Sequence, residues 1–182
     1  MLSLPSRPGW TLGADVSDEG RWAFVSLSPG TGPENELWAI DLAAVPLDKD
    51  GVLDFTALRT AHAAAGRAKA GPAPASTHAA PFSADGAGLP LRKLAATADA
   101  SYEYVASRDD GSIVLRTNAQ APRYRLVVGS VEAGPPVPPP STWPDLVPQH
   151  PANTMQWAAA TQGDTLLVEY LEDVKAALQV RM

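Results

Sequence analysis

The sequence predicts an all-β fold built from a repeated unit of antiparallel strands, and three observations lead to this prediction. Apolar and polar residues alternate with the period of a β-strand on both sides of three glycines, Gly20, Gly111 and Gly163. Each of these three hairpins is followed by a further strand-like run. Equivalent strands begin at Tyr102 and Met155, a spacing that fits the roughly 40 to 50 residues of one four-stranded repeat.

The first hairpin shows the alternation clearly, in the segment VSDEGRWAFVSLS (residues 16–28). Trp22 and Phe24 are expected on one face of its second strand, and Ala23 and Val25 on the other. Gly20 is expected to form the turn because glycine takes the positive φ that a short hairpin needs.

Four kinds of strand follow one another in each repeat. The first strands are expected at Leu12–Val16, Tyr102–Ala106 and Met155–Ala160. The second strands are expected at Trp22–Leu27, Ile113–Thr117 and Leu166–Leu171, and the third at Asn35–Leu42, Arg123–Val131 and Ala176–Met182. Outer fourth strands are expected at Leu91–Ala95 and Pro144–Pro148. Short turns and repeats of this length are typical of propeller blades, so we expect a partial β-propeller with about three four-stranded antiparallel blades.

A low-complexity insertion explains why the first two repeats are far apart. Residues 43–88 are rich in Ala, Gly and Pro and poor in large apolar side chains, so they can contribute little to a core. Asp54 is expected to cap a short helix over residues 55–69. The expected organisation is a first blade at 1–42 and 89–99, the insertion at 43–88, a second blade at 100–148 and an incomplete blade at 149–182.

Composition excludes several classes of function. The 182 residues include no cysteine, which excludes disulfides and thiolate chemistry. The formal net charge of −6 argues against a nucleic-acid partner, because phosphate binding relies on clustered Lys and Arg. No run approaches the roughly 18 apolar residues of a membrane span, and the first residues lack the apolar centre of a signal peptide. We therefore expect a cytoplasmic chain with no membrane partner.

The sequence offers no candidate for catalysis, a metal or a cofactor. The segment most similar to a Gly-x-Ser-x-Gly nucleophile elbow is VGSVEAG (residues 128–134). Its glycines do not have the motif's spacing from the serine, and it continues a strand. His62 and His78 lie in the insertion and His150 lies in a turn, so none has the oriented environment that a general base needs. No two histidines fall at helix or hairpin spacing with a carboxylate, as a zinc site would require.

Two polar features have a structural interpretation. The segment SPGTGPEN (residues 28–35) lacks the lysine and the following helix of a phosphate-binding loop, so we expect a hairpin loop there. Asp15, Glu103 and the surroundings of Gln156 fall on first strands, which line the central channel of a propeller. They are expected to form a polar channel wall, with contact to a peptide as the functional alternative.

Three collinear segments resemble the propeller of the prolyl oligopeptidases, serine peptidases that cut short peptides after proline. They are GWTLGADVSDEGRWAFVSLSPGTGPENELWAIDL (residues 9–42), ASYEYVASRDDGSIVLRTNAQAPRYRLV (100–127) and WPDLVPQHPANTMQWAAATQGDTLLVEYLEDVKAALQV (143–180). The most specific motifs within them are TNAQAPRYRL (117–126) and YLEDVKAALQ (170–179). We interpret both motifs as blade packing. In this interpretation Tyr124 and Leu126 share one face, residues 172–175 form a turn, and Leu171, Val174 and Leu178 enter the core.

The resemblance implies a function that belongs to a larger protein. In this family a seven-bladed propeller covers an α/β-hydrolase domain, and that domain carries the Ser, Asp and His of the catalytic triad. The present chain lacks this domain, so we expect it to be inactive alone and to control the access of short proline-containing peptides. Thr11 and Thr31 stand where some members carry Met and Cys at the edge of the substrate pocket. The alternatives are a stand-alone peptide- or protein-binding scaffold and a non-functional truncated fragment.

An incomplete propeller is also expected to expose an apolar face at each end. These faces are expected near Trp10 and Trp22 on one side and near Leu167 and Val180 on the other. Each square ångström of apolar surface left in water costs roughly 25 cal/mol, so the isolated chain is expected to associate or aggregate.

Overall fold

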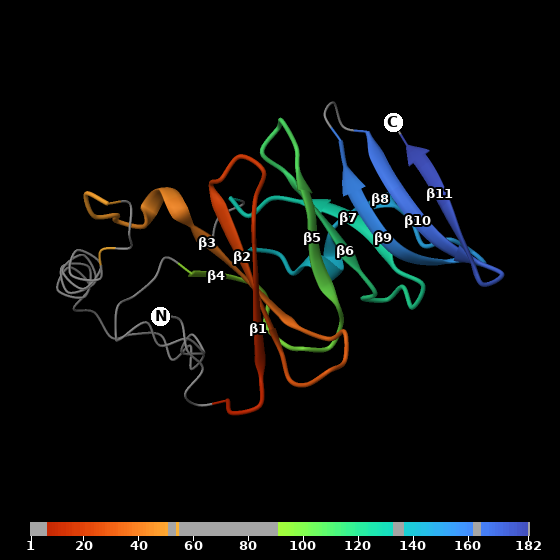
Figure 1. The fold of residues 1–182 in the computed structure, drawn as a ribbon, viewed down its shortest axis with the longest axis horizontal. Helices are drawn as coiled ribbons and strands as arrows, with labels where there is room; N and C mark the ends of the chain where they lie inside the picture. The colour runs from red at the N-terminus through yellow and green to blue at the C-terminus, as the bar shows by residue number, and fades with distance from the viewer. Residues whose placement is uncertain (1–6, 51–53, 55–90, 133–136, 162–164, 182) are drawn as a thin grey trace.

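The structure is a computed structural model that describes residues 7–50, 54, 91–132, 137–161 and 165–181. Within these residues, eleven β-strands form three antiparallel sheets, with two short 3-10 helices as the only helical elements. The predicted all-β fold is therefore confirmed. Figure 1 shows the three sheets side by side, with the sheet of β5–β8 in the middle. Most of the predicted insertion, and the predicted helix over residues 55–69, lie outside the described residues.

The first sheet has the order β1-β2-β3-β4. Its strands are β1 (Thr11–Val16), β2 (Trp22–Ser28), β3 (Glu36–Asp41) and β4 (Leu91–Ala95). Gly20, in the turn between β1 and β2, has the expected positive φ of 72°. The helix η1 (Leu42–Ala44) follows β3, and the Asp41 carboxylate accepts a hydrogen bond from the backbone nitrogen of Ala43.

The second sheet repeats this order, and the third sheet contains three strands. The second sheet consists of β5 (Tyr102–Ser107), β6 (Ile113–Thr117), β7 (Arg125–Gly129) and β8 (Asp145–Val147), with η2 (Pro140–Thr142) before β8. The third consists of β9 (Thr154–Ala160), β10 (Leu166–Glu172) and β11 (Lys175–Arg181). Asp173 and Val174 form the two-residue turn of the last hairpin, both with positive φ, as a hairpin turn of this length favours.

The sheets pack face to face through two clusters of buried apolar side chains. The cluster between the first and second sheets contains Trp22, Phe24 and Leu37 from the first sheet and Ile113, Leu115 and Val127 from the second. The cluster between the second and third sheets contains Val114, Leu126 and Val147 on one side and Met155, Val168 and Tyr170 on the other. Because successive strand residues point to opposite faces, β6 contributes alternately to the two clusters. All five of its residues are buried.

Two buried polar side chains join neighbouring sheets at defined backbone positions. The Asn35 side chain accepts a hydrogen bond from the Tyr102 nitrogen (2.7 Å) and donates one to the Tyr102 oxygen (3.0 Å). Arg116 donates from Nη2 to the Met155 oxygen (2.8 Å), and its guanidinium lies 3.6 Å from the Tyr124 ring centroid. Asn35 thus links the first sheet to the second, and Arg116 links the second to the third.

The structure corrects two predictions about the core. Leu171, Val174 and Leu178 are exposed, at 44%, 92% and 62%, because they lie on the turn or on the face of the third sheet that points away from the second. The end face expected near Trp10 and Trp22 is not exposed. Trp22 is only 3% exposed because its face of β2 packs against the second sheet, and Trp10 is half-buried against a third apolar cluster on the other face of the first sheet. The exposed face predicted near Leu167 and Val180 is confirmed at Val180, which is exposed together with Trp157, whereas Leu167 is half-buried.

A buried tyrosine allows a test of this packing. The Tyr170 side chain is fully buried, and its hydroxyl has no hydrogen-bond partner among the described residues. Tyr170→Phe should therefore leave the free energy of unfolding unchanged or raise it by up to about 1 kcal/mol, because it removes an unsatisfied polar group. The matched control is Tyr104→Phe, which removes a hydroxyl bonded to Asp18 and Ser107 and should cost about 0.5–1.5 kcal/mol. Urea denaturation measures both, and an equal loss for the two variants would contradict the packing.

Candidate functional site

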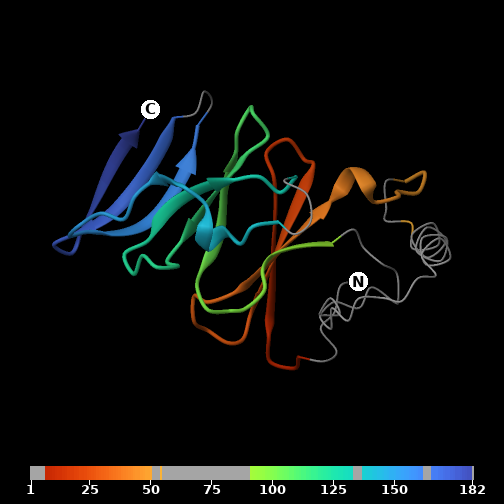
Figure 2. The ribbon, with the colours of Figure 1, turned by 180° about the vertical axis from the view of Figure 1, so that it is seen from behind.

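The first strand of each sheet lies at one edge of that sheet, where the expected polar side chains are open to solvent. Asp15 on β1, Glu103 on β5 and Gln156 on β9 are all exposed. In Figure 1, β1 and β5 lie toward the viewer, whereas β4, at the opposite edge of the first sheet, is in front in Figure 2. The three sheets follow one another along an arc, and we call the side with β1, β5 and β9 the inner side of this arc.

A cleft of about 260 Å³ separates the first sheet from β5 on this inner side, and we call it the inner cleft. Its lining includes Asp15, Phe24 and Ser28 from the first sheet and Glu103 and Tyr104 from the second. The strand register explains why these side chains meet. Asp15 pairs with Phe24 and Thr11 pairs with Ser28, and residues that are paired across two strands share one face of the sheet.

Aromatic rings form one wall of the inner cleft. The rings of Phe24 and Tyr104 stack with their centroids 4.7 Å apart and an interplanar angle of 15°. The Tyr104 hydroxyl donates to Oδ2 of Asp18 at 3.2 Å. Burial raises the pKa of the Tyr104 hydroxyl, and the Asp18 carboxylate raises it further, so this hydroxyl stays neutral near pH 7.

The charged groups of the inner cleft are acidic. Glu103 accepts hydrogen bonds from Nη1 of Arg116 (2.8 Å) and from Oγ of Ser101 (3.0 Å), and its side chain remains 51% exposed. The Asp15 carboxylate has no hydrogen bond or ion pair with any residue that the structure describes. Among the described residues that line the cleft, none is a lysine or an arginine. The inner cleft therefore favours a positively charged group.

Thr11 and Thr31 do not line the inner cleft, but each is next to a residue that does. Thr11 is the first residue of β1 and is exposed opposite Ser28. Thr31 is exposed in the loop between β2 and β3, next to Gly32, which lines the cleft. The structure thus brings both positions to the end of the first sheet where β2 leads into β3. The segment of residues 28–35 forms this loop, as expected from its sequence.

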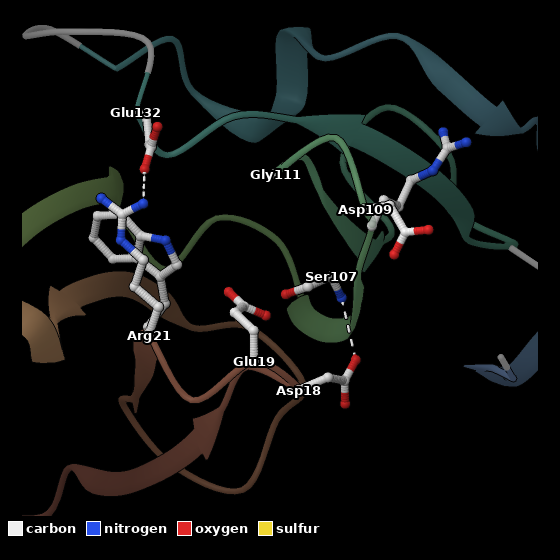
Figure 3. Close-up of a pocket in the computed structure, with 9 residues that line it drawn as sticks. Asp18, Glu19, Arg21, Ser107, Asp109, Gly111 and Glu132 are labelled. Atoms are coloured by element: carbon white, nitrogen blue, oxygen red, sulfur yellow. Dashed lines mark hydrogen bonds and ion pairs between the residues drawn. The ribbon is translucent and has the colours of Figure 1, made fainter. Parts of the chain in front are cut away.

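A second cleft of about 400 Å³ lies at the opposite end of the first and second sheets, between the β1–β2 and β5–β6 turns. Figure 3 shows Arg21 and Glu132 pointing toward one another across it, and these side chains form an ion pair. The Asp18 carboxylate accepts a hydrogen bond from the Ser107 nitrogen at 3.3 Å. The charges of this turn cleft are therefore largely used to join the two sheets.

His150, which the sequence places in a turn, has a structural role. Nδ1 of His150 accepts hydrogen bonds from the backbone nitrogens of Ala152 and Asn153, so this histidine closes a turn. Among the described residues, no group of three or more His, Asp or Glu side chains could hold a metal ion. No helix in the described part of the chain is long and apolar enough to cross a membrane.

The fold defines the chain as an arc of propeller blades, and comparison with known proteins gives its family. Residues 72–182, more than half of the chain, match the family model described as the prolyl oligopeptidase N-terminal β-propeller domain. The chain therefore belongs to this family.

Solved structures show the same fold at low sequence identity. Prolyl oligopeptidase B from Galerina marginata, bound to a 35mer hydrolysis and macrocyclization substrate, has a TM-score of 0.66 and 18% identity over 97% of this chain. Its apo form matches with the same TM-score and 16% identity. A structure from an analysis of two prolyl endopeptidases gives a TM-score of 0.61 and 19% identity over 98% of this chain. The chain spans only 18–19% of the length of these proteins.

The turn cleft generates a prediction about pH. Burial opposes ionisation of Glu19, but hydrogen bonds, including one from the Ser107 side chain, and the Arg21 charge lower its pKa below the ordinary value of 4.5. A carboxyl with a lowered pKa in the folded state stabilises the fold above its ordinary pKa and loses this contribution as pH falls. Unfolding midpoints measured from pH 6 to pH 3 should therefore fall less steeply for Glu19→Gln than for the wild type.

The control for this measurement is Ser107→Ala, which removes one of the groups that hold Glu19 ionised and should give part of the same flattening. If Glu19→Gln follows the wild-type profile throughout, the turn cleft does not stabilise the Glu19 carboxylate.

Proposed function

We propose that this chain is the non-catalytic propeller portion of a prolyl oligopeptidase-type serine endopeptidase. In this proposal, its inner side controls the access of short proline-containing peptides to a hydrolase domain of the same protein. The proposal includes a cytoplasmic location and assigns Thr11 and Thr31 to the edge of the substrate path. The family match over residues 72–182 is the observation that carries it.

The geometry of the inner side supports contact with extended peptides. All six residues of β1 are exposed, and β1 pairs with β2 alone among the described strands, so its other edge has unpaired backbone groups. Unpaired strand edges bind extended chains through main-chain hydrogen bonds, and a folded protein presents few such segments. The inner cleft adds a place for one side chain next to this edge.

A stand-alone peptide-binding scaffold is the second candidate function. The described residues that line the inner cleft all come from the first two sheets and the loops that join their strands, so in this candidate function the peptide is bound without another domain. The two functions differ in whether peptide capture serves a hydrolase domain, and both predict that the chain binds peptides without cleaving them.

Binding and turnover can be measured on the 182-residue chain with a fluorescent proline-containing pentapeptide. We expect saturable binding of the free peptide and no binding of the same sequence fixed in a rigid loop of a folded protein. We also expect no hydrolysis, because cleavage needs a nucleophile, a base and an oxyanion hole in one site. Turnover that follows the purified chain, with fluorophosphonate labelling of one of its serines, would contradict the proposal. Absence of peptide binding would contradict both candidate functions.

A further inference from the structure

We infer that the inner cleft is a subsite for a positively charged side chain of the bound peptide, with Asp15 as the residue that selects it. This inference rests on the proposed function, because it assumes that peptides reach the inner side of the arc. It adds a chemical preference, for lysine or arginine near the proline, to a binding surface defined so far only by its position.

The size of the inner cleft fits one side chain. Its volume of about 260 Å³ corresponds to about nine water molecules at roughly 30 Å³ each. An extended side chain can displace these waters, whereas a folded element cannot enter. The cleft lies beside β1, whose free edge would hold the peptide backbone.

One carboxylate of the inner cleft has no positively charged partner among the described residues. Arg116 neutralises part of the Glu103 charge, and the Arg116 side chain is itself buried behind that carboxylate. Asp15 faces the cleft from β1 without a partner among the described residues. A cation in the cleft would therefore pair with Asp15 first and with the exposed part of Glu103 second.

The remaining lining suits the rest of a lysine or arginine side chain. The Tyr104 ring, which is stacked on the buried Phe24 and is itself partly exposed, offers an apolar surface for the methylene stem and an aromatic surface that attracts a cation. The Ser28 hydroxyl can accept a hydrogen bond from the charged group.

Two further observations separate the inner cleft from a general accumulation of acidic residues. Thr11 and Thr31, which the proposed function assigns to the edge of the substrate path, are next to Ser28 and Gly32 of its lining. The turn cleft is larger and also acidic, but it contains two arginines, and Arg21 is paired with Glu132 across it. Of these two clefts, the inner cleft is the one whose described lining combines an unpaired carboxylate with no lysine or arginine.

The test compares two peptides that differ only in charge. Acetylated and amidated Ala-Gly-Arg-Pro-Gly is titrated against the same peptide with citrulline in place of arginine, using the 182-residue chain at low ionic strength and isothermal calorimetry. A solvent-accessible ion pair changes affinity by about two- to fivefold, so the arginine peptide should bind tighter by that factor. The difference should shrink in high salt.

Three variants assign the effect to the cleft. Asp15→Asn should reduce the arginine-to-citrulline preference to about one. Its fold should be unaffected because Asp15 is exposed and its carboxylate forms no hydrogen bond or ion pair with a described residue. Asp109→Asn makes the same charge change at the turn cleft and should retain the preference. Ser28→Lys places a cation in the inner cleft and should reverse the preference, so that the citrulline peptide binds tighter.

Each outcome decides the inference. Equal binding of the two peptides to the wild type would overturn it and leave the proposed function intact, because peptides would still bind. A preference that survives in Asp15→Asn, or that disappears in Asp109→Asn, would also overturn it, since the selectivity would then come from overall charge. If neither peptide binds, the proposed function fails and this inference fails with it.

Discussion

Burial of the middle sheet on both of its faces is the constraint on which the inner side of the arc depends. Leu115 packs toward the first sheet and Val114 toward the third, and each such side chain contributes about 1.5–3 kcal/mol when fully buried. Because both neighbours pack against the same strand, neither can shift without exposing apolar surface. This double packing fixes β5 beside the first sheet and thereby places Glu103 across the inner cleft from Asp15.

Hydrogen bonds of buried polar side chains fix the relative position of neighbouring sheets, in addition to this apolar packing. Asn35 bonds to both backbone groups of Tyr102 and so aligns β5 with the loop that carries Thr31. Arg116 bonds to the Met155 oxygen and also holds the Glu103 carboxylate. An unpaired buried polar group lowers the stability of the fold, so these hydrogen bonds favour one relative position of the sheets over others. The inner cleft takes its shape from the same contacts that stabilise the fold.

The fold could be predicted from the sequence because its signals are local. Strand alternation and the turn at Gly20 depend on residues close in the chain. The sequence also places Asp15 and Glu103 on first strands, but the aromatic wall between them could not be predicted, because the stack of Phe24 on Tyr104 joins two different repeats. The apolar pattern also predicts a strand at Leu178 without showing which face of that strand is covered. The predicted burial of Leu178 is wrong for this reason. Pairing between strands is readable from the sequence, whereas packing between sheets is not.

The central claim is that the inner side of the arc binds extended peptides. Backbone amide shifts in an NMR titration with a proline-containing pentapeptide test it most directly, because they report position as well as binding. We expect saturable changes along β1, β5 and the loop between β2 and β3, and unchanged amides in β4 at the opposite edge. Changes confined to β4 or to the exposed third-sheet face around Val180 would place the peptide elsewhere and contradict the account.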